Sequence, residues 1–401
     1  MARAAELSAR RPSTVCIELG AASGRILAQP IRADQDQPPF ARSTRDGFAV
    51  RAAEAATHRD LRLAGSTRAG EAPAKPLPKG AAWEIMTGAP VPEGADAVAM
   101  IEHVEAANGH VRLLADRKVK PGENIVAQGA QAHAGDELIP AGSAIGFSLI
   151  ALAATCGCPM LDVFVRPRVA ILTTGDELVP VESSPAAGQI RNSNAPMLAA
   201  MVASAGGEPW ILPTAADNAE SLNAALAEAA QADMLLISGG VSAGKFDLVE
   251  PALARRGARF HFTGVRIQPG KPLVFGEMPG SANRSVPFFG LPGNPVSSAV
   301  TFLLFGAPIL GALAGSRELG PRFALALLAA ETDRRAKPGL TRFLPAQCNF
   351  NPGAGQPPEV AIVPWQGSGD LAALSRSNCF LVIPEETSSF PKGEIVRILL
   401  P

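Results

Sequence analysis

The sequence predicts an α/β protein with additional β-rich domains, and three observations indicate this fold class. Short apolar runs alternate with helix-length segments over residues 168–318. Residues 43–133 and 319–401 instead contain short apolar runs separated by Gly and Pro. Hydrophobic residues make up 47% of the 401 residues, so the chain can bury the cores of two to four domains.

The α/β segment, residues 168–318, is predicted to form a three-layer domain around a parallel sheet. Its predicted strands cover residues 169–174, 210–214, 234–238 and 286–290, and its predicted helices cover residues 195–205, 219–231, 246–256 and 295–313. Asn194 is expected to cap the first helix, and Asp217 or Asn218 the second. Strands that alternate with helices of this length are typical of parallel α/β layers.

The remaining segments are predicted to form three further parts of an elongated subunit. Residues 43–133 read as an inserted β-rich domain with apolar runs at 82–86, 97–102 and 111–115. Residues 319–401 read as a C-terminal β domain, a small barrel or sandwich, with apolar runs at 323–330, 360–366, 379–385 and 395–400. Residues 14–42 and 134–167 flank the insert and are expected to form a linking domain.

Charge and cysteine content exclude several classes of protein. The chain has 36 Lys plus Arg and 37 Asp plus Glu, which removes the general electrostatic argument for binding nucleic acid or a membrane surface. No apolar run approaches 18 residues, and the first residues lack the apolar core of a secretory signal. The five cysteines have no framework spacing, and Cys156 and Cys158 fit a buried core better than a metal site. We expect a cytoplasmic protein.

Three polar loops, at 173–178, 238–247 and 290–297, directly follow predicted strands. The carboxyl ends of parallel strands meet at one edge of a sheet, so these loops should converge on one crevice. Gly-rich turns before helices present free backbone N–H groups that suit an oxyanion. The middle loop fits the G-x-x-x-x-G-K pattern of a P-loop, but Phe246 stands where Ser or Thr would bind magnesium. A P-loop NTPase is therefore only an alternative.

Several motifs occur in an order that resembles one family. PPFARSTRDGFAVR (38–51) and MTGAPVPEGADAV (86–98) are followed by TGDEL, GGVSAGKFD, PGKP (269–272) and GLPGNPVS. This ordered set is similar to that of the molybdopterin molybdotransferases, the family of bacterial MoeA and the gephyrin C-terminal domain. TGDEL and GGVS also occur in related molybdopterin-binding domains, so the two N-terminal motifs make the resemblance specific.

The resemblance implies a function and an assembly. The substrates would be adenylyl-molybdopterin and molybdate, AMP would leave with the help of Mg²⁺, and the product would be the molybdenum cofactor. The subunit would be elongated, with four domains, and would form a homodimer. Its cleft would lie between the α/β domain of one subunit and the insert of the other. Contacts with the adenylyltransferase and with molybdoenzyme maturation proteins are further expectations.

The resemblance also assigns roles to residues within the matched motifs. Asp46, Glu177 and Asp247 are the expected catalytic residues, and Asp247 and Asp217 offer hard oxygen ligands for Mg²⁺. The expected substrate-binding residues are Thr87, Asp176, Gly239, Gly240, Ser242, Pro292 and Asn294. The expected molybdate-binding residues are Lys271, Ser297, Arg342 and Ser368. Without the resemblance, Asp46 would read as a turn former and Glu177 as a carboxylate at a helix start.

Some positions depart from the family pattern. Gln268 stands where Lys is frequent, and Ala130, Gln131 and Asn218 stand where the family often has carboxylates. These changes remove one cation and up to three carboxylates, which predicts an active enzyme with a higher molybdate requirement. Two alternatives remain: a diverged molybdopterin-binding or carrier protein with little turnover, and an interaction scaffold.

Overall fold

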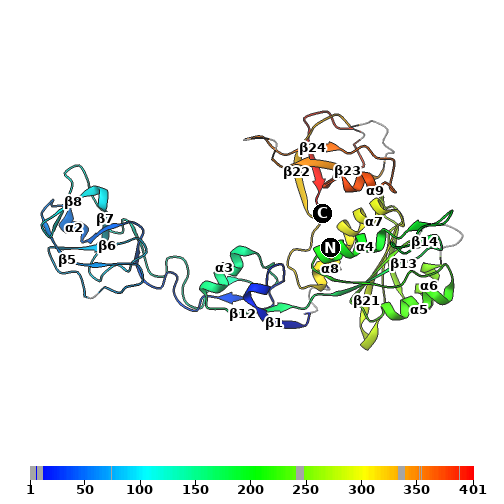
Figure 1. The fold of residues 1–401 in the computed structure, drawn as a ribbon, viewed down its shortest axis with the longest axis horizontal. Helices are drawn as coiled ribbons and strands as arrows, with labels where there is room; N and C mark the ends of the chain where they lie inside the picture. Colours follow the sequence, from blue (N-terminus) through cyan, green and yellow to red (C-terminus); the bar gives the residue numbers. More distant parts are fainter. Residues whose placement is uncertain are drawn as a thin grey trace.

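The computed structural model describes residues 6, 12–73, 75–240, 248–332, 339–351, 353, 355–387 and 389–401. The molecule is elongated (Figure 1), with a β-rich unit at one end, a small linking unit in the middle, and the α/β and C-terminal units side by side at the other end. The polypeptide passes through the linking unit twice, on its way to the β-rich unit and on its return.

The α/β unit is built on a six-stranded sheet. In spatial order its strands are β16 (Glu208–Ile211), β13 (Arg168–Thr173), β17 (Met234–Ser238), β21 (Ser285–Leu291), β20 (Val274–Pro279) and β18 (Arg259–Thr263). The first four are parallel, as predicted. The sequence patterns did not predict β18 and β20, which extend one edge with antiparallel pairings and make the sheet mixed.

Helices cover both faces of this sheet, which confirms the three-layer architecture. Along β13, Ala170 and Leu172 face α5 (Ala219–Ala229) and α6 (Val249–Arg255). The alternate residues Val169 and Ile171 face the other layer, which contains α4 (Asn194–Ser204), α7 (Pro295–Thr301), the π-helical segment η4 (Phe302–Gly306) and α8 (Ala307–Leu313). Burial on both faces explains why these strands are continuously apolar.

The continuous helical stretch Pro295–Leu313 is long and apolar enough to span a membrane, with a mean hydropathy of 1.9 in its most apolar window. However, 67% of that window is buried inside the protein. Its residues pack against the sheet on one side and against the C-terminal barrel on the other. The stretch has the burial of a core helix.

Two asparagines cap the helices at the carboxyl edge of the sheet. Asn218 accepts a hydrogen bond from Ser221 N at 2.9 Å and so caps α5, as predicted. The predicted cap of α4 by Asn194 is wrong, because Asn192 Oδ1 accepts from Ala195 N at 3.1 Å instead. Asn194 is the first residue of α4, and its side chain points to other partners.

The C-terminal strands form a closed barrel, as expected. Its order is β23 (Thr341–Asn349), β24 (Glu359–Ile362), β22 (Phe323–Leu328), β26 (Ile395–Leu399) and β25 (Cys379–Ile383), and β25 pairs back with β23. Cys379 is buried in this core, and burial raises the pKa of its thiol to about 12. The short strand β19 (Ile267–Gln268) pairs with β23 and joins the barrel to the α/β unit.

The β-rich unit contains a second six-stranded sheet. Its order is β7 (Ala97–Met100), β4 (Gly47–Val50), β6 (Ala81–Ile85), β5 (Leu61–Thr67), β9 (His110–Leu113) and β8 (Val104–Ala107), with α2 (Ala52–Ala55) beside it. Strands β3 (Arg42–Ser43) and β10 (Ile125–Val126) pair where the chain enters and leaves this unit. The two ends of the insert therefore lie next to each other.

The linking unit combines the two segments that flank the insert. Strand β1 (Thr14–Glu18) pairs with β12 (Met160–Phe164), and β2 (Ile31–Arg32) pairs with β11 (Glu137–Ile139). Helix α3 (Phe147–Thr155) packs on them. Cys156 is buried in this core, and Cys158 Sγ lies 3.6 Å from Cys156 O, as expected for packing residues. Because the chain forms four such units, we propose the domain boundaries that the sequence predicts: 14–42 with 134–167, 43–133, 168–318 and 319–401.

Candidate functional site

The polar loops meet at one edge of the central sheet, as the sequence predicts. Strands β13, β17 and β21 are adjacent and parallel, so their carboxyl ends lie side by side. Thr174 N donates to Ser238 O at 3.1 Å, and Gly239 N donates to Leu291 O at 3.3 Å. These two bonds join the beginnings of all three loops.

A cleft of about 790 Å³ opens at this edge. Six predicted site residues line it: Glu177, Asp217, Gly239, Gly240, Pro292 and Asn294. Its walls also include the start of α4 and the loop that precedes α9 (Leu371–Ser375). A cleft at the carboxyl edge of a parallel sheet is the expected ligand site of this fold class.

Gly239 and Gly240 have no room for a side chain. Their φ angles are +99° and +63°, which favour glycine. A Cβ on Gly239 would lie 2.6 Å from Thr174 O, and one on Gly240 would lie 2.7 Å from Val249 Cγ2. The tight turn keeps backbone close to the cleft. Ser242, Lys245, Phe246 and Asp247, on which other predicted roles and the P-loop alternative depend, lie outside the described residues.

Carboxylates gather on one wall of the cleft. Asp176 Oδ1 accepts from Asp217 N at 3.0 Å. Burial raises the pKa of Asp217, and the negative charges of Asp176 and Glu177 raise it further, whereas the bond with Asp176 opposes the rise. Over the described residues, no group of three His, Cys, Asp or Glu side chains is arranged to hold a metal ion. Glu177 precedes β14 (Leu178–Val179), so its reading as a helix-start carboxylate is wrong.

The predicted molybdate-binding residues come from separate elements that lie next to one another. Gln268 and Arg342 are partners in the β19–β23 pairing, and Arg342 is buried. Val296 N donates to Ser368 O at 3.0 Å, which places the loop before α9 against the start of α7, next to Ser297. Lys271 is exposed on the turn that follows β19.

Asp46 and Thr87 form a separate pair in the β-rich unit. Asp46 Oδ1 accepts from Thr87 N at 2.7 Å and from Thr87 Oγ1 at 2.9 Å. These bonds hold the pKa of Asp46 below its ordinary value. The Asp46 side chain therefore binds the loop that follows β6 and does not only stabilise the turn in which it lies. The β-rich unit, which contains this pair, lies at the opposite end of the molecule from the α/β unit, which contains most of the cleft residues (Figure 1).

Sequence reasoning missed the residues that connect the loops. Asn192 Nδ2 lies 2.8 Å from Thr173 Oγ1, and Asn194 Nδ2 lies 2.9 Å from Ser238 Oγ. Ser298 Oγ donates to Pro292 O and holds the third loop. The RNSN segment at 191–194, two asparagines before a predicted helix, was the available signal.

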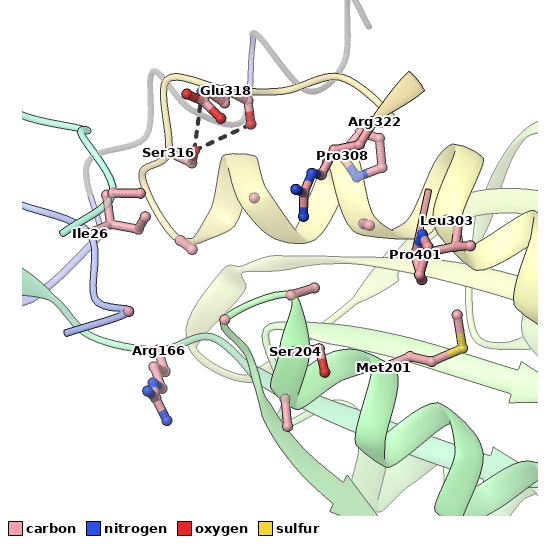
Figure 2. Close-up of a pocket in the computed structure, with 18 of the residues that line it drawn as sticks. Ile26, Arg166, Met201, Ser204, Leu303, Pro308, Ser316, Glu318, Arg322 and Pro401 are labelled. Carbon is pink, nitrogen blue, oxygen red and sulfur yellow. Dashed lines mark hydrogen bonds between the residues drawn. The ribbon is translucent and has the colours of Figure 1, made fainter. Parts of the chain in front are cut away.

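A second cavity, of about 690 Å³, lies where the linking, α/β and C-terminal units meet (Figure 2). Its wall includes Met201 and Ser204 of α4, Pro308 of α8 and Arg322, and none of the predicted site residues that the structure describes contributes to it. Described residues of the three polar loops line the other cleft, which we take as the candidate site.

Comparisons with known proteins agree with this domain organisation. Residues 1–157 match "MoeA N-terminal region (domain I and II)", residues 170–312 match "Probable molybdopterin binding domain", and residues 328–400 match "MoeA C-terminal region (domain IV)". The three matched regions follow one another in the order of the MoeA domains, and the middle one is described as a probable molybdopterin-binding domain. The matches therefore define the chain as a molybdopterin-related protein with the domain order of MoeA.

Individual relatives match over nearly their whole length. The molybdopterin molybdenumtransferase of Nostoc is 34% identical over 96% of this chain and 88% of its own length. That of Bacillus subtilis is 35% identical over 94% and 87%. A crystal structure of the MoeA protein from Pyrococcus horikoshii aligns with 100% of this chain and 98% of its own, with a TM-score of 0.75 and 31% identity. The chain belongs to the MoeA family of molybdopterin molybdenumtransferases.

Proposed function

We propose that this protein inserts molybdate into the dithiolene of adenylyl-molybdopterin and releases AMP. The observation that carries the proposal is the convergence of three strand-end loops on one cleft, next to the turn that holds Lys271 and the buried Arg342. The backbone N–H of Gly240 would donate to a phosphate oxygen. The ammonium of Lys271 and the hydroxyls of Ser297 and Ser368 would hold molybdate.

Mg²⁺ is part of the proposal because both substrates are anionic. Burial, and then the negative charges of Asp176 and Glu177, raise the pKa of Asp217, so three carboxylates lie close together at this wall. Such carboxylates fit a divalent cation, with Asp217 and Asp247 as its ligands. The bound ion would neutralise charge on the phosphoanhydride during hydrolysis. Glu177 of one subunit and Asp46 of a second subunit would position the attacking water.

A homodimer is the proposed assembly. Asp46 and Thr87 belong to the β-rich unit, which lies at the other end of the chain's structure from the α/β unit (Figure 1), so a second subunit would have to supply them to the cleft. The linking unit exposes apolar side chains that a partner could cover: Val15, Phe147, Met160 and Val165 are 40%, 89%, 44% and 39% exposed. The cytoplasm remains the proposed location, and the adenylyltransferase and molybdoenzyme maturation proteins remain proposed contacts.

The deciding experiment is a turnover assay. Purified protein, adenylyl-molybdopterin, Mg²⁺ and molybdate should give AMP and active molybdenum cofactor in equal amounts. Tight pterin binding without AMP release would instead favour the carrier protein. ATP hydrolysis in the absence of pterin would favour the P-loop NTPase.

A further inference from the structure

Two polar atoms at the cleft have no hydrogen-bond partner. They are Thr174 Oγ1 and Asn194 Oδ1, and over the described residues they are the only buried side-chain nitrogen or oxygen atoms in this condition. Both residues line the cleft. A buried polar atom without a partner costs about 1–3 kcal/mol, so its presence needs a reason.

The orientation of the Asn194 amide is fixed by its neighbours. Its Nδ2 donates to Ser238 Oγ at 2.9 Å and to Gly293 O at 2.6 Å, which uses both amide hydrogens. Gly293 O is a carbonyl and can only accept, so the amide cannot be flipped. Asn194 Oδ1 is therefore an acceptor, and only a ligand that carries an N–H or O–H donor would satisfy it.

The Thr174 hydroxyl lies directly beneath the glycine turn. A Cβ on Gly239 or Gly240 would come within 3.1 or 2.9 Å of Thr174 Oγ1. The preceding Thr173, by contrast, bonds to Thr214 Oγ1 at 3.1 Å. Both unpartnered oxygens are shielded from solvent, although both residues line the cleft.

We infer that Thr174 and Asn194 form a recognition pair for a heteroaromatic ring that presents an N–H donor edge, and that this pair positions the substrate's ring in the cleft. The inference rests on the proposed function, whose substrate has two such rings, pterin and adenine. Molybdate and the ionised phosphoanhydride are excluded as partners of Asn194 Oδ1, because their oxygens carry no hydrogen that this acceptor could bind. Ring recognition by the pair is thus separate from the proposed oxyanion binding at Gly240.

The test uses a substitution that removes only the hydroxyl. Thr174→Val keeps the branched shape, and Thr174→Ser keeps the hydroxyl as the matched control. Affinities for metal-free molybdopterin and, separately, for AMP are measured by anaerobic titration calorimetry. Thr174→Val should weaken one of these ligands about tenfold, and Thr174→Ser should stay within about twofold of the native protein. The ligand whose affinity falls identifies which ring, pterin or adenine, the pair binds.

A stability measurement distinguishes recognition from a structural role. Because Thr174 Oγ1 has no partner to lose, Thr174→Val should not lower the Tm of the unliganded protein. Thr332→Val is the contrast, because buried Thr332 Oγ1 accepts from Phe390 N at 2.7 Å; this change should lower Tm without affecting either affinity.

Native affinity of Thr174→Val for both ligands would overturn the inference, and so would a fall in its Tm as large as that of Thr332→Val. A native protein that binds neither ligand would refute the proposed function instead.

Discussion

The carboxylate of Asp46 shows how two hydrogen bonds set the state of a single residue. The side chain is exposed, yet both the backbone N–H and the hydroxyl of Thr87 donate to the same oxygen, Oδ1. Both bonds favour the ionised form. Asp46 is thus kept as a carboxylate with one oxygen occupied and the other, Oδ2, open to water or substrate.

Removing one of these donors should move the pKa of Asp46. In Thr87→Val the hydroxyl bond is lost but the stronger backbone bond remains, so the pKa should rise only part of the way toward 3.8. The pKa of Asp46 is lower in the folded protein than the ordinary value of 3.8, so the contact with Thr87 stabilises the fold at pH values above 3.8. This stabilisation is lost as the pH falls through the pKa of Asp46 in the folded protein. Carboxyl ¹³C NMR titration measures the change. An unchanged midpoint would show that the hydroxyl does not contribute.

Gln268 offers a second test at the scale of one side chain. It is exposed at the pairing with Arg342, so a cation placed there would add to the charge beside the proposed molybdate site. Gln268→Lys should lower the molybdate concentration for half-maximal cofactor formation several-fold, about 1 kcal/mol, and less at high salt. Gln347→Lys adds the same charge to β23 where it pairs with Ala361. Equal responses from both variants would mean that only net charge matters.

At the scale of elements, runs with strong local patterns were predictable and those defined by distant partners were not. MLLIS was predicted as a strand at 234–238, and β17 has these bounds. The convergence of the three loops followed from parallel strand order alone. In contrast, β18 alternates between half-buried and exposed residues at the sheet edge and gave no clear signal. The role of Asn194 was missed because its partners, Ser238 and Gly293, are distant in sequence.

The turn that carries Lys271 depends on a glycine packed against a helix. Gly270 has a φ of +111°, and a Cβ there would lie 2.6 Å from Thr301 Cγ2 on α7. Gly270→Ala should therefore lower the free energy of unfolding by about 1–3 kcal/mol and also raise the molybdate requirement, because the turn must move. Gly320→Ala, where nothing lies within 4 Å, is the control for chemical denaturation. Similar denaturation curves for the two variants would contradict the packing argument.

For the whole molecule, the elongated shape separates residues that the proposed reaction needs together. Asp46 belongs to the unit at one end and Lys271 to the unit at the other (Figure 1). A single chain in this shape cannot close one site around both. A symmetric pair of chains would create two equivalent sites, each with contributions from both subunits.

Mixing two inactive variants tests this arrangement. Asp46→Ala and Lys271→Ala proteins should each be inactive, but mixed dimers would contain one cleft with both native residues. After complete subunit exchange of equal amounts, about a quarter of native AMP release should return, since half the dimers are mixed and each has one intact cleft of two. Mixing two samples of the same variant is the control. No recovery, with exchange verified by mass spectrometry, would show that both residues act within one chain.

The closed C-terminal barrel has a consequence for synthesis of the chain. The last strand in chain order, β26, lies between β22 and β25. Until β26 has been synthesised, β22 and β25 present open edges to any neighbouring chain. The strands of the α/β sheet all precede the barrel strands in the chain, so a nascent protein can form that sheet early. The barrel that carries Arg342, and with it one side of the proposed molybdate pocket, closes later.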